Sequence, residues 1–142
     1  MKVVSKLLIT LATVIYGVVP ILVDFSPTHI LNPEWVPHAR LHVVWLISTN
    51  GLIALLAMWL LWAKREVILS SILGLCVVGG FMIAGWTSGL YGGSLAEPGL
   101  EAFKVLGLDI NVVVFGTTLI MLVIAIGLWR MDADDKAMAS SS

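Results

Sequence analysis

Four long apolar stretches determine what this chain can fold into. Residues 7–22, 41–62, 67–90 and 112–129 together take up more than half of its 142 residues. An α-helix rises 1.5 Å per residue, so about 20 mostly apolar residues cross the hydrocarbon core of a bilayer. The three later stretches lie within the usual range for a spanning helix, and the first is marginally short. The sequence therefore predicts an all-α membrane protein whose four transmembrane helices form an antiparallel bundle.

The composition leaves room for one domain only. Hydrophobic residues make up 59% of the chain and charged residues 12%, whereas soluble domains are about 25% charged. No segment between the apolar stretches is long enough for a separate soluble domain. We predict a single membrane domain over residues 1–131, followed by a disordered cytoplasmic tail over 132–142. The net charge of −1 offers no basic surface, which excludes nucleic acid as a partner.

The N-terminus resembles the start of a secretory signal peptide, because Lys2 and Lys6 precede an apolar stretch. No small-x-small cleavage site follows, which favours an uncleaved first span; cleavage would leave three spans. The single cysteine, Cys76, lies inside the third stretch. It cannot form an intrachain disulfide or support a paired-cysteine redox cycle. We predict that it is a small buried apolar residue.

Basic residues are distributed unequally between the two sides of the predicted bundle. With the N-terminus in the cytoplasm, the positive-inside rule is satisfied: Lys2, Lys6, Lys64, Arg65, Arg130 and Lys136 lie inside, and Arg40 and Lys104 outside. Both termini are therefore predicted to be cytoplasmic, in a multi-pass protein of the bacterial inner (plasma) membrane. The tryptophans fit this orientation, with Trp59, Trp62 and Trp129 at the inner interface and Trp35 and Trp45 at the outer one.

Small residues recur along the third stretch at the spacing of one helix face. Gly85, Gly89 and Gly93 form two consecutive Gly-x-x-x-Gly steps. In lipid, such a face lets another helix approach closely. The sequence predicts packing against a neighbouring span, with homodimerisation as the alternative. Asn50, in the second stretch, is predicted to hydrogen-bond with a neighbouring helix, because its amide needs partners in hydrocarbon.

The most unusual local sequence runs from Asn32 to His42. Pro37 suits the first turn of a helix, where its missing N–H costs nothing, so the second helix is predicted to begin there. The i, i+4 spacing then places His38 and His42 on one face, and Trp45 and Thr49 continue that face. Arg40 points elsewhere, towards lipid phosphate or Glu34.

Several roles are open to these histidines. The His-x-x-x-His spacing suits a metal, but Ala39 stands where a zinc protease has glutamate. Two histidines of one helix cannot ligate one haem iron from opposite sides. The remaining roles are hydrogen bonding at the membrane interface, proton transfer and ligand binding. We predict no metal and assign no cofactor. The predicted ligand-binding cluster at the outer end of the bundle comprises Asp24, Glu34, His38, Arg40, His42, Asn50 and Asp109. Asp109 can also act as the N-cap of the fourth helix.

The Pro-His-Ala-Arg-x-His run, placed after an Asn-Pro-x-Trp loop and between the first two spans, resembles a group of small uncharacterised bacterial four-span membrane proteins. That resemblance implies the four-span plan and no particular activity. More loosely, the plan resembles the DoxX-like and the emopamil-binding-protein-like groups. The latter implies a sterol-sized cavity with buried carboxylates and a histidine, whereas this chain has no carboxylate deep in a span.

Two classes of function follow. The first is a non-catalytic protein that binds a lipid or small hydrophobic ligand, or that serves as an accessory subunit of a membrane complex. The second is a small intramembrane isomerase or oxidoreductase with His38 or His42 as general acid/base. The charged residues lie at the rim rather than inside a span, which favours the first class. The bilayer is the predicted partner in either case, together with a membrane protein or a second copy of the chain.

Overall fold

The computed structural model describes residues 2–96 and 104–141. Its elements are, in order, α1 (Lys2–Gly17), α2 (Val19–Asp24), α3 (Pro37–Trp59), the π-helical turn η1 (Leu60–Lys64), α4 (Val67–Thr87), the 3₁₀ turn η2 (Ser88–Leu90), the strands β1 (Lys104–Val105) and β2 (Leu108–Asp109), and α5 (Ile110–Ser141).

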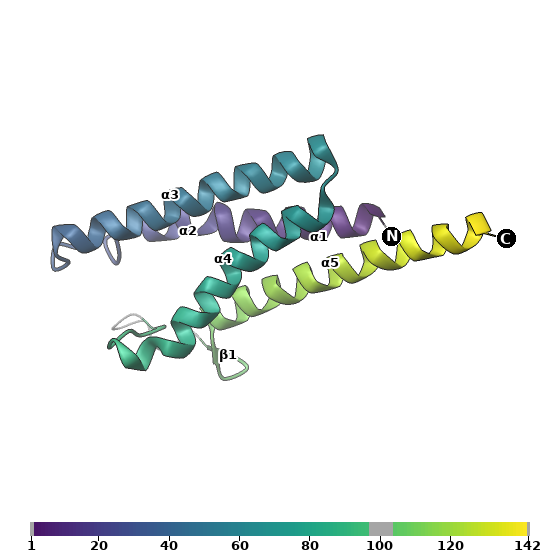
Figure 1. Cartoon of the computed structure of the whole chain (residues 1–142). Coiled ribbons are helices and arrows are strands. Elements are labelled where there is room, and N and C mark those ends of the chain that lie inside the picture. Colours follow the sequence, from purple (N-terminus) through teal and green to yellow (C-terminus); the bar gives the residue numbers. More distant parts are fainter. Residues whose placement is uncertain (1, 97–103, 142) are drawn as a thin grey trace.

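Within the described residues, four helical segments are long and apolar enough to cross a membrane: Lys2–Asp24, Pro37–Lys64, Val67–Leu90 and Ile110–Asp132. Each contains most or all of one predicted stretch, so the all-α, four-span prediction is confirmed. The two termini lie at the same end of the molecule (Figure 1). Which end faces the cytoplasm stays a prediction.

The first span is interrupted where α1 passes into α2. Val18 donates its N–H to the carbonyl of Val14 at 2.9 Å, and Leu22 donates to Val18 at 3.3 Å, so helical bonding continues across the junction. Pro20 has no N–H, so it leaves the carbonyl of Tyr16 without its usual donor. This missing bond accounts for the break between two helices that together make one span.

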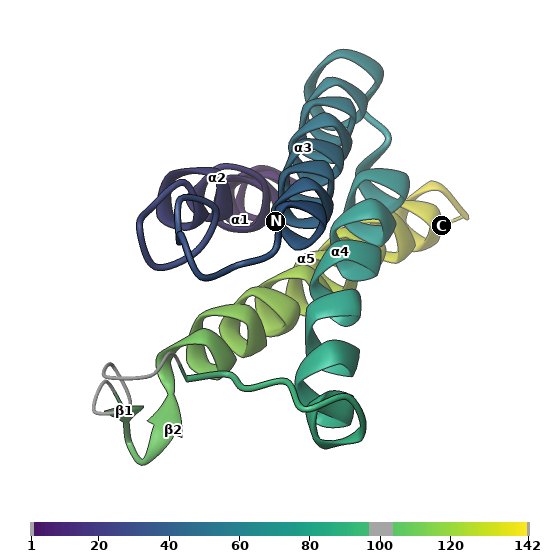
Figure 2. The same ribbon diagram turned by 90° about the vertical axis from the view of Figure 1, so that its left-hand side faces the viewer.

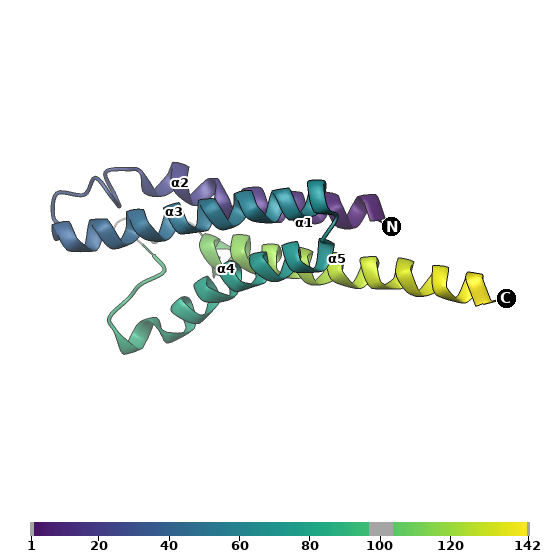
Figure 3. The ribbon, with the colours of Figure 1, turned by 45° about the horizontal axis from the view of Figure 1, so that its top comes forward.

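The core is concentrated in the half of the bundle nearest the termini. There α1 packs against α3, α4 and α5, as the end-on view shows (Figure 2). From η1, which joins them, α3 and α4 diverge towards the opposite end (Figures 1 and 3). The buried apolar residues come from all four spans: Ile9, Ala12, Tyr16, Ala54, Leu61, Val67, Val78, Leu122 and Ala125.

Small residues determine how closely α1 approaches α3. A Cβ atom added at Gly17 would overlap with the Cβ of Ala54, and one added at Gly51 would lie 3.2 Å from Cδ1 of Ile21. Gly74 of α4 leaves room for Tyr16 of α1 in the same way, because an added Cβ would lie 3.1 Å from Cε1 of Tyr16. Close backbone approach of this kind is a main source of association between helices in lipid.

The glycine face predicted for the third span does not pack against another span. A Cβ added at Gly89 would meet nothing within 4 Å among the described residues, whereas at Gly85 it would meet Leu95 and at Gly93 it would meet Tyr91, both in the adjoining loop. Packing of this face within the chain is therefore a wrong prediction, because α4 has already diverged from its neighbours at this level. The homodimer alternative stays a prediction.

Several hydroxyl side chains are buried in the bundle, whereas Cys76 is not. Cys76 is exposed, so its predicted burial is wrong. Ser70 donates from Oγ to the carbonyl of Ala57 at 2.9 Å and so joins α4 to α3. Thr13 and Ser71 donate within their own helices to the carbonyls one turn earlier, at 2.8 and 2.9 Å. These bonds satisfy hydroxyls that hydrocarbon could not solvate.

Lysine ammonium groups lie over tryptophan rings at the end of the bundle that holds the termini. Lys2 lies 5.1 Å from the ring centroid of Trp129, Lys6 lies 5.1 Å from Trp62, and Lys64 lies 5.0 Å from Trp59. The indole Nε1 of Trp62 also donates to Oγ1 of Thr10 at 3.1 Å. Amphipathic rings paired with cations suit the bilayer interface, as predicted for these three tryptophans.

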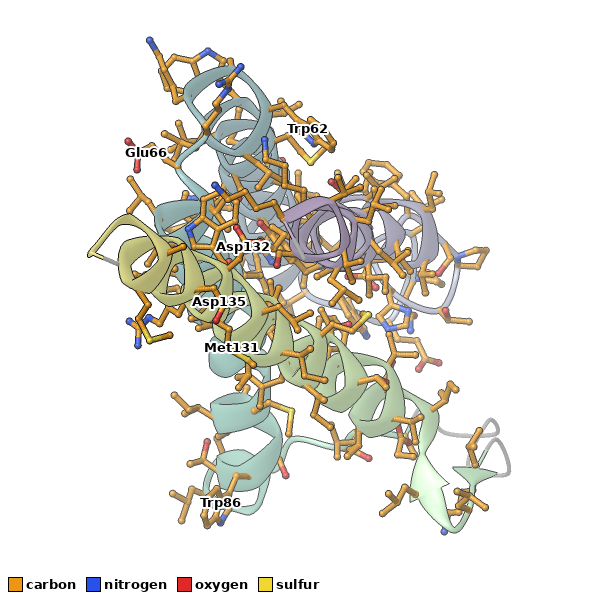
Figure 4. All side chains as sticks on the ribbon, turned by 90° about the vertical axis from the view of Figure 1, so that its right-hand side faces the viewer. Trp62, Glu66, Trp86, Met131, Asp132 and Asp135 are labelled. Atoms are coloured by element: carbon orange, nitrogen blue, oxygen red, sulfur yellow. The ribbon has the colours of Figure 1, made fainter. Side chains whose placement is uncertain are left out.

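The last helix is longer than its apolar stretch. It continues to Ser141, whereas the sequence predicts a disordered tail from residue 132. Lys2 Nζ lies 3.7 Å from Asp132 Oδ2 and holds the beginning of this extension. Figure 4 shows Asp132 close to α1. The tail contains alanine, methionine and lysine, which favour helix.

A two-strand hairpin that the sequence analysis did not predict precedes α5. Lys104 pairs with Asp109 and Val105 with Leu108. Between them Leu106 and Gly107 have φ values of 52° and 82°, which are those of a type I′ turn. The usual signal for this turn is Asn-Gly or Asp-Gly, and Leu-Gly does not give it.

Candidate functional site

The second span begins where the sequence predicts. Val36 is extended, with φ −61° and ψ 142°, and α3 starts at Pro37. Ala39 donates its N–H to the carbonyl of Val36 at 3.0 Å. The first turns of α3 therefore hold His38, Arg40 and His42 at the end of the bundle away from the termini (Figure 1).

His38 and His42 contact each other directly. Their Nε2 atoms are 3.0 Å apart, and their ring planes meet at 89° with centroids 4.5 Å apart. The predicted shared face is confirmed. Both side chains are exposed, so they lie on the outside of α3 rather than inside the bundle.

Trp45 continues this face towards the membrane. Its ring is stacked on His42, with centroids 5.9 Å apart and an angle of 30° between the planes. His42, Trp45, Leu46 and Thr49 line a shallow hollow of about 340 Å³. The predicted continuation through Trp45 and Thr49 agrees with this arrangement.

The predicted carboxylates lie in separate settings. Glu34 is exposed, and its backbone N–H donates to Asn32 Oδ1 at 2.9 Å. Asp24 ends α2, where its carbonyl accepts the N–H of Ile30 at 3.0 Å. Within residues 2–96 and 104–141, no three His, Cys, Asp or Glu side chains are grouped closely enough to hold a metal ion.

Asp109 caps the last helix. Its Oδ1 accepts the backbone N–H of Asn111 at 2.8 Å, which confirms the N-cap prediction. The strand that holds Asp109 lies beside β1 and α5, apart from the start of α3 in both Figure 1 and Figure 2. The structure does not bring Asp109 to the histidine pair.

Arg40 is half-buried and points to a different side of α3. Its Nε atom is buried and has no hydrogen-bond partner in the described part of the chain. Positions four, eight and eleven residues further on, which are Val44, Ser48 and Gly51, share its helix face. Arg40 therefore lies on the face that α3 presents to the first span, at the end of α3 away from the chain termini.

Asn50 is half-buried near the middle of the second span. Its side-chain amide hydrogen-bonds with none of the residues that the structure describes. The predicted hydrogen bond to a neighbouring helix is therefore not formed among the described residues, although the backbone of Asn50 lies next to Gly17 of the first span.

A groove between the first span and α3 was missed by the sequence analysis. It has a volume of about 480 Å³. Its lining is almost entirely apolar and comes from both helices: Thr13, Val14, Gly17, Val18, Ile21, Ser48, Gly51, Leu52, Ala54, Leu55 and Met58. The signal that could have revealed the groove is a set of small residues on two spans. Gly17 lies on the first span, and Gly51 and Ala54 lie on one face of α3.

The groove and Arg40 are aligned along α3. Arg40 precedes Gly51 by eleven positions, which corresponds to about 16 Å along a helix axis. The hydrocarbon core of one leaflet is about 15 Å thick, half of the ~30 Å of a bilayer. Arg40 does not line the groove, and its separation from Gly51 along α3 is close to the thickness of one leaflet.

Comparison with known proteins gives one family. Residues 8–137 match a family of unknown function, DUF6640. No curated protein matches the chain. No solved structure matches it either. Because the matched residues cover nearly the whole chain and all four spans, this small multi-pass membrane protein belongs to the DUF6640 family.

Proposed function

We propose that this protein binds a phospholipid of the bacterial plasma membrane, with an acyl chain in the groove between α1 and α3 and the phosphate at Arg40. The groove of about 480 Å³ is the observation on which the proposal depends. Its volume lies within the range of small-molecule sites, about 300–1,000 Å³. The protein acts as a binder or accessory subunit rather than as a catalyst.

The lining of the groove supports an acyl chain as the occupant. Hydroxyls come only from Thr13 and Ser48, and Thr13 already donates its proton to the carbonyl of Ile9 at 2.8 Å. The remaining lining residues are apolar or glycine. The groove lies between two helical segments that are long and apolar enough to span a membrane. Lipid chains are the molecules that surround such a surface.

Arg40 supports a phosphate as the polar end of the ligand. A buried guanidinium N–H without an acceptor is costly, and the Nε of Arg40 is in this state among the described residues. Guanidinium groups bind phosphate oxygens through two parallel hydrogen bonds. The separation of about 16 Å along α3 between Arg40 and Gly51 suits an acyl chain that runs from the interface to mid-membrane.

Native mass spectrometry of protein extracted in mild detergent tests this function. We expect the wild type to retain one phospholipid, and Ser48→Phe to lose it, because the new ring occupies the groove. Ile72→Phe is the matched control, since Ile72 is an exposed position on α4 that does not line the groove. Arg40→Gln should release phospholipid yet still allow an uncharged lipid. Equal retention by the wild type, Ser48→Phe and Arg40→Gln would overturn the proposal.

A further inference from the structure

We propose that His38 and His42 together bind a divalent transition-metal ion of the Zn²⁺, Cu²⁺ or Ni²⁺ class at the outer end of α3. The pair supplies two imidazole ligands and leaves the other coordination positions to water or a bound molecule. This site lies on the outside of α3 and does not depend on lipid binding in the groove.

The distance between the two nitrogens fits a single ion. Zinc binds imidazole nitrogen at about 2.0–2.1 Å, so two neighbouring ligands on one ion lie roughly 2.8–3.4 Å apart for angles between 90° and tetrahedral. The Nε2 atoms of His38 and His42 are 3.0 Å apart. The sequence spacing alone could not give this distance. The distance replaces the expectation that no metal binds with the proposal of a two-histidine site.

The surroundings of the pair hold it in place. Both residues lie on α3, a helix of 23 residues that begins at Pro37. The indole of Trp45 is stacked on His42 and restricts rotation of that ring. A pair on a rigid element, with a packed neighbour, loses little freedom when it binds a ligand. Both imidazoles are exposed, so water can reach the remaining positions of the ion.

The donor set determines the class of ion. Imidazole suits zinc, copper and nickel, whereas calcium and magnesium prefer oxygen ligands. No third His, Cys, Asp or Glu joins the pair among residues 2–96 and 104–141, so the site has open positions. Without the ion, one Nε2–H donates to the other Nε2. Binding moves that proton to Nδ1 of the same ring, which frees both Nε2 lone pairs and releases no proton from the neutral pair.

Calorimetric titration of Zn²⁺ into purified protein tests the site, with an affinity tag that contains no histidine. We expect saturable binding of one ion per chain. His38→Ala and His42→Ala should each weaken binding by at least about tenfold, since loss of even an outer-shell partner costs 10–100-fold. His29→Ala is the control, because His29 lies in the preceding loop, against Thr28 and Trp35.

A spectroscopic measurement distinguishes a two-histidine site from adventitious binding. With Cu²⁺ as the probe, electron paramagnetic resonance should show two equatorial imidazole nitrogens in the wild type and one in either single variant. Circular dichroism should show unchanged helicity in all variants, because both side chains are exposed. The site is overturned if the double variant binds Zn²⁺ as tightly as the wild type, or if His29→Ala weakens binding as much as His42→Ala.

Discussion

Gly17 of α1 and Ala54 of α3 meet so closely that no side chain fits at Gly17: an added Cβ would overlap with the Cβ of Ala54 and lie 3.7 Å from its Cα. This contact fixes the spacing of the first two spans and forms part of the lining of the groove. A larger residue can be accommodated only if one helix moves.

Gly17→Val should therefore destabilise the protein by about 1–3 kcal/mol, the usual cost of overpacking. Unfolding in mixed micelles, followed by circular dichroism, measures this change. Gly89→Val is the matched control, since an added Cβ there meets nothing within 4 Å among the described residues. Equal destabilisation by the two substitutions would contradict the structure and favour a homodimer packed through the glycine face of α4.

The hydrogen bond between α4 and α3 gives a second prediction. Ser70→Ala removes the bond from Oγ to the carbonyl of Ala57 and should cost about 0.6 kcal/mol, and not more than about 1.7 kcal/mol. Ser71→Ala removes only a bond within α4, to Val67, and should change stability by less. The same unfolding measurement compares them, and a larger loss for Ser71→Ala would contradict this account.

Arg40 gives a prediction that depends on ionic strength. Arg40→Ala should weaken the binding of anionic phospholipid to the micelle-solubilised protein, by about 1 kcal/mol at low salt, because an interfacial cation contributes about that much. The difference from the wild type should shrink as salt rises, since Arg40 is only half-buried and salt screens charges that solvent can reach. A titration of the micelle-solubilised protein with anionic phospholipid, followed by the unfolding temperature at low and at high salt, measures it. A difference that does not change with salt would point to lost packing instead.

The orientation of the bundle gives the fourth prediction. The positive-inside rule places the turn after Lys64 and the end of the chain in the cytoplasm. Alkaline phosphatase fused after Lys64 or Met138 should be inactive in a bacterial host, and the same enzyme fused at Pro98 should be active. Activity of the Met138 fusion would overturn the predicted orientation.

Hydropathy and one proline were enough to predict the spans and the start of α3. Apolar stretches of spanning length form helices in lipid, and proline next to such a stretch favours the first turn of the helix. The partners of each helix could not be predicted in this way. Gly89 and Gly17 look alike in sequence, yet only Gly17 touches another span, because α4 diverges from its neighbours before Gly89 is reached.

For the polar residues too, the sequence predicts contacts within one helix but not contacts between segments. Helical spacing brought His38 and His42 together, since both lie on one rigid element, and the structure confirms their contact. Helical spacing could not predict the positions of Asp24, Glu34 and Asp109. These residues belong to other segments, whose positions depend on loops and on the hairpin. The groove was missed because it is formed by two helices and is visible only when they are packed.

The divergence of α3 and α4 has a consequence for how the two leaflets act on this protein. Near the termini, all four spans share one dry core, and the lipid of that leaflet only surrounds it. At the other end α3 and α4 diverge, while α2 stays beside α3 (Figure 3). We therefore expect the lipid chains of that leaflet to contact faces of α3 and α4 that face protein at the end near the termini. The folding free energy is therefore sensitive to the composition of one leaflet far more than to that of the other.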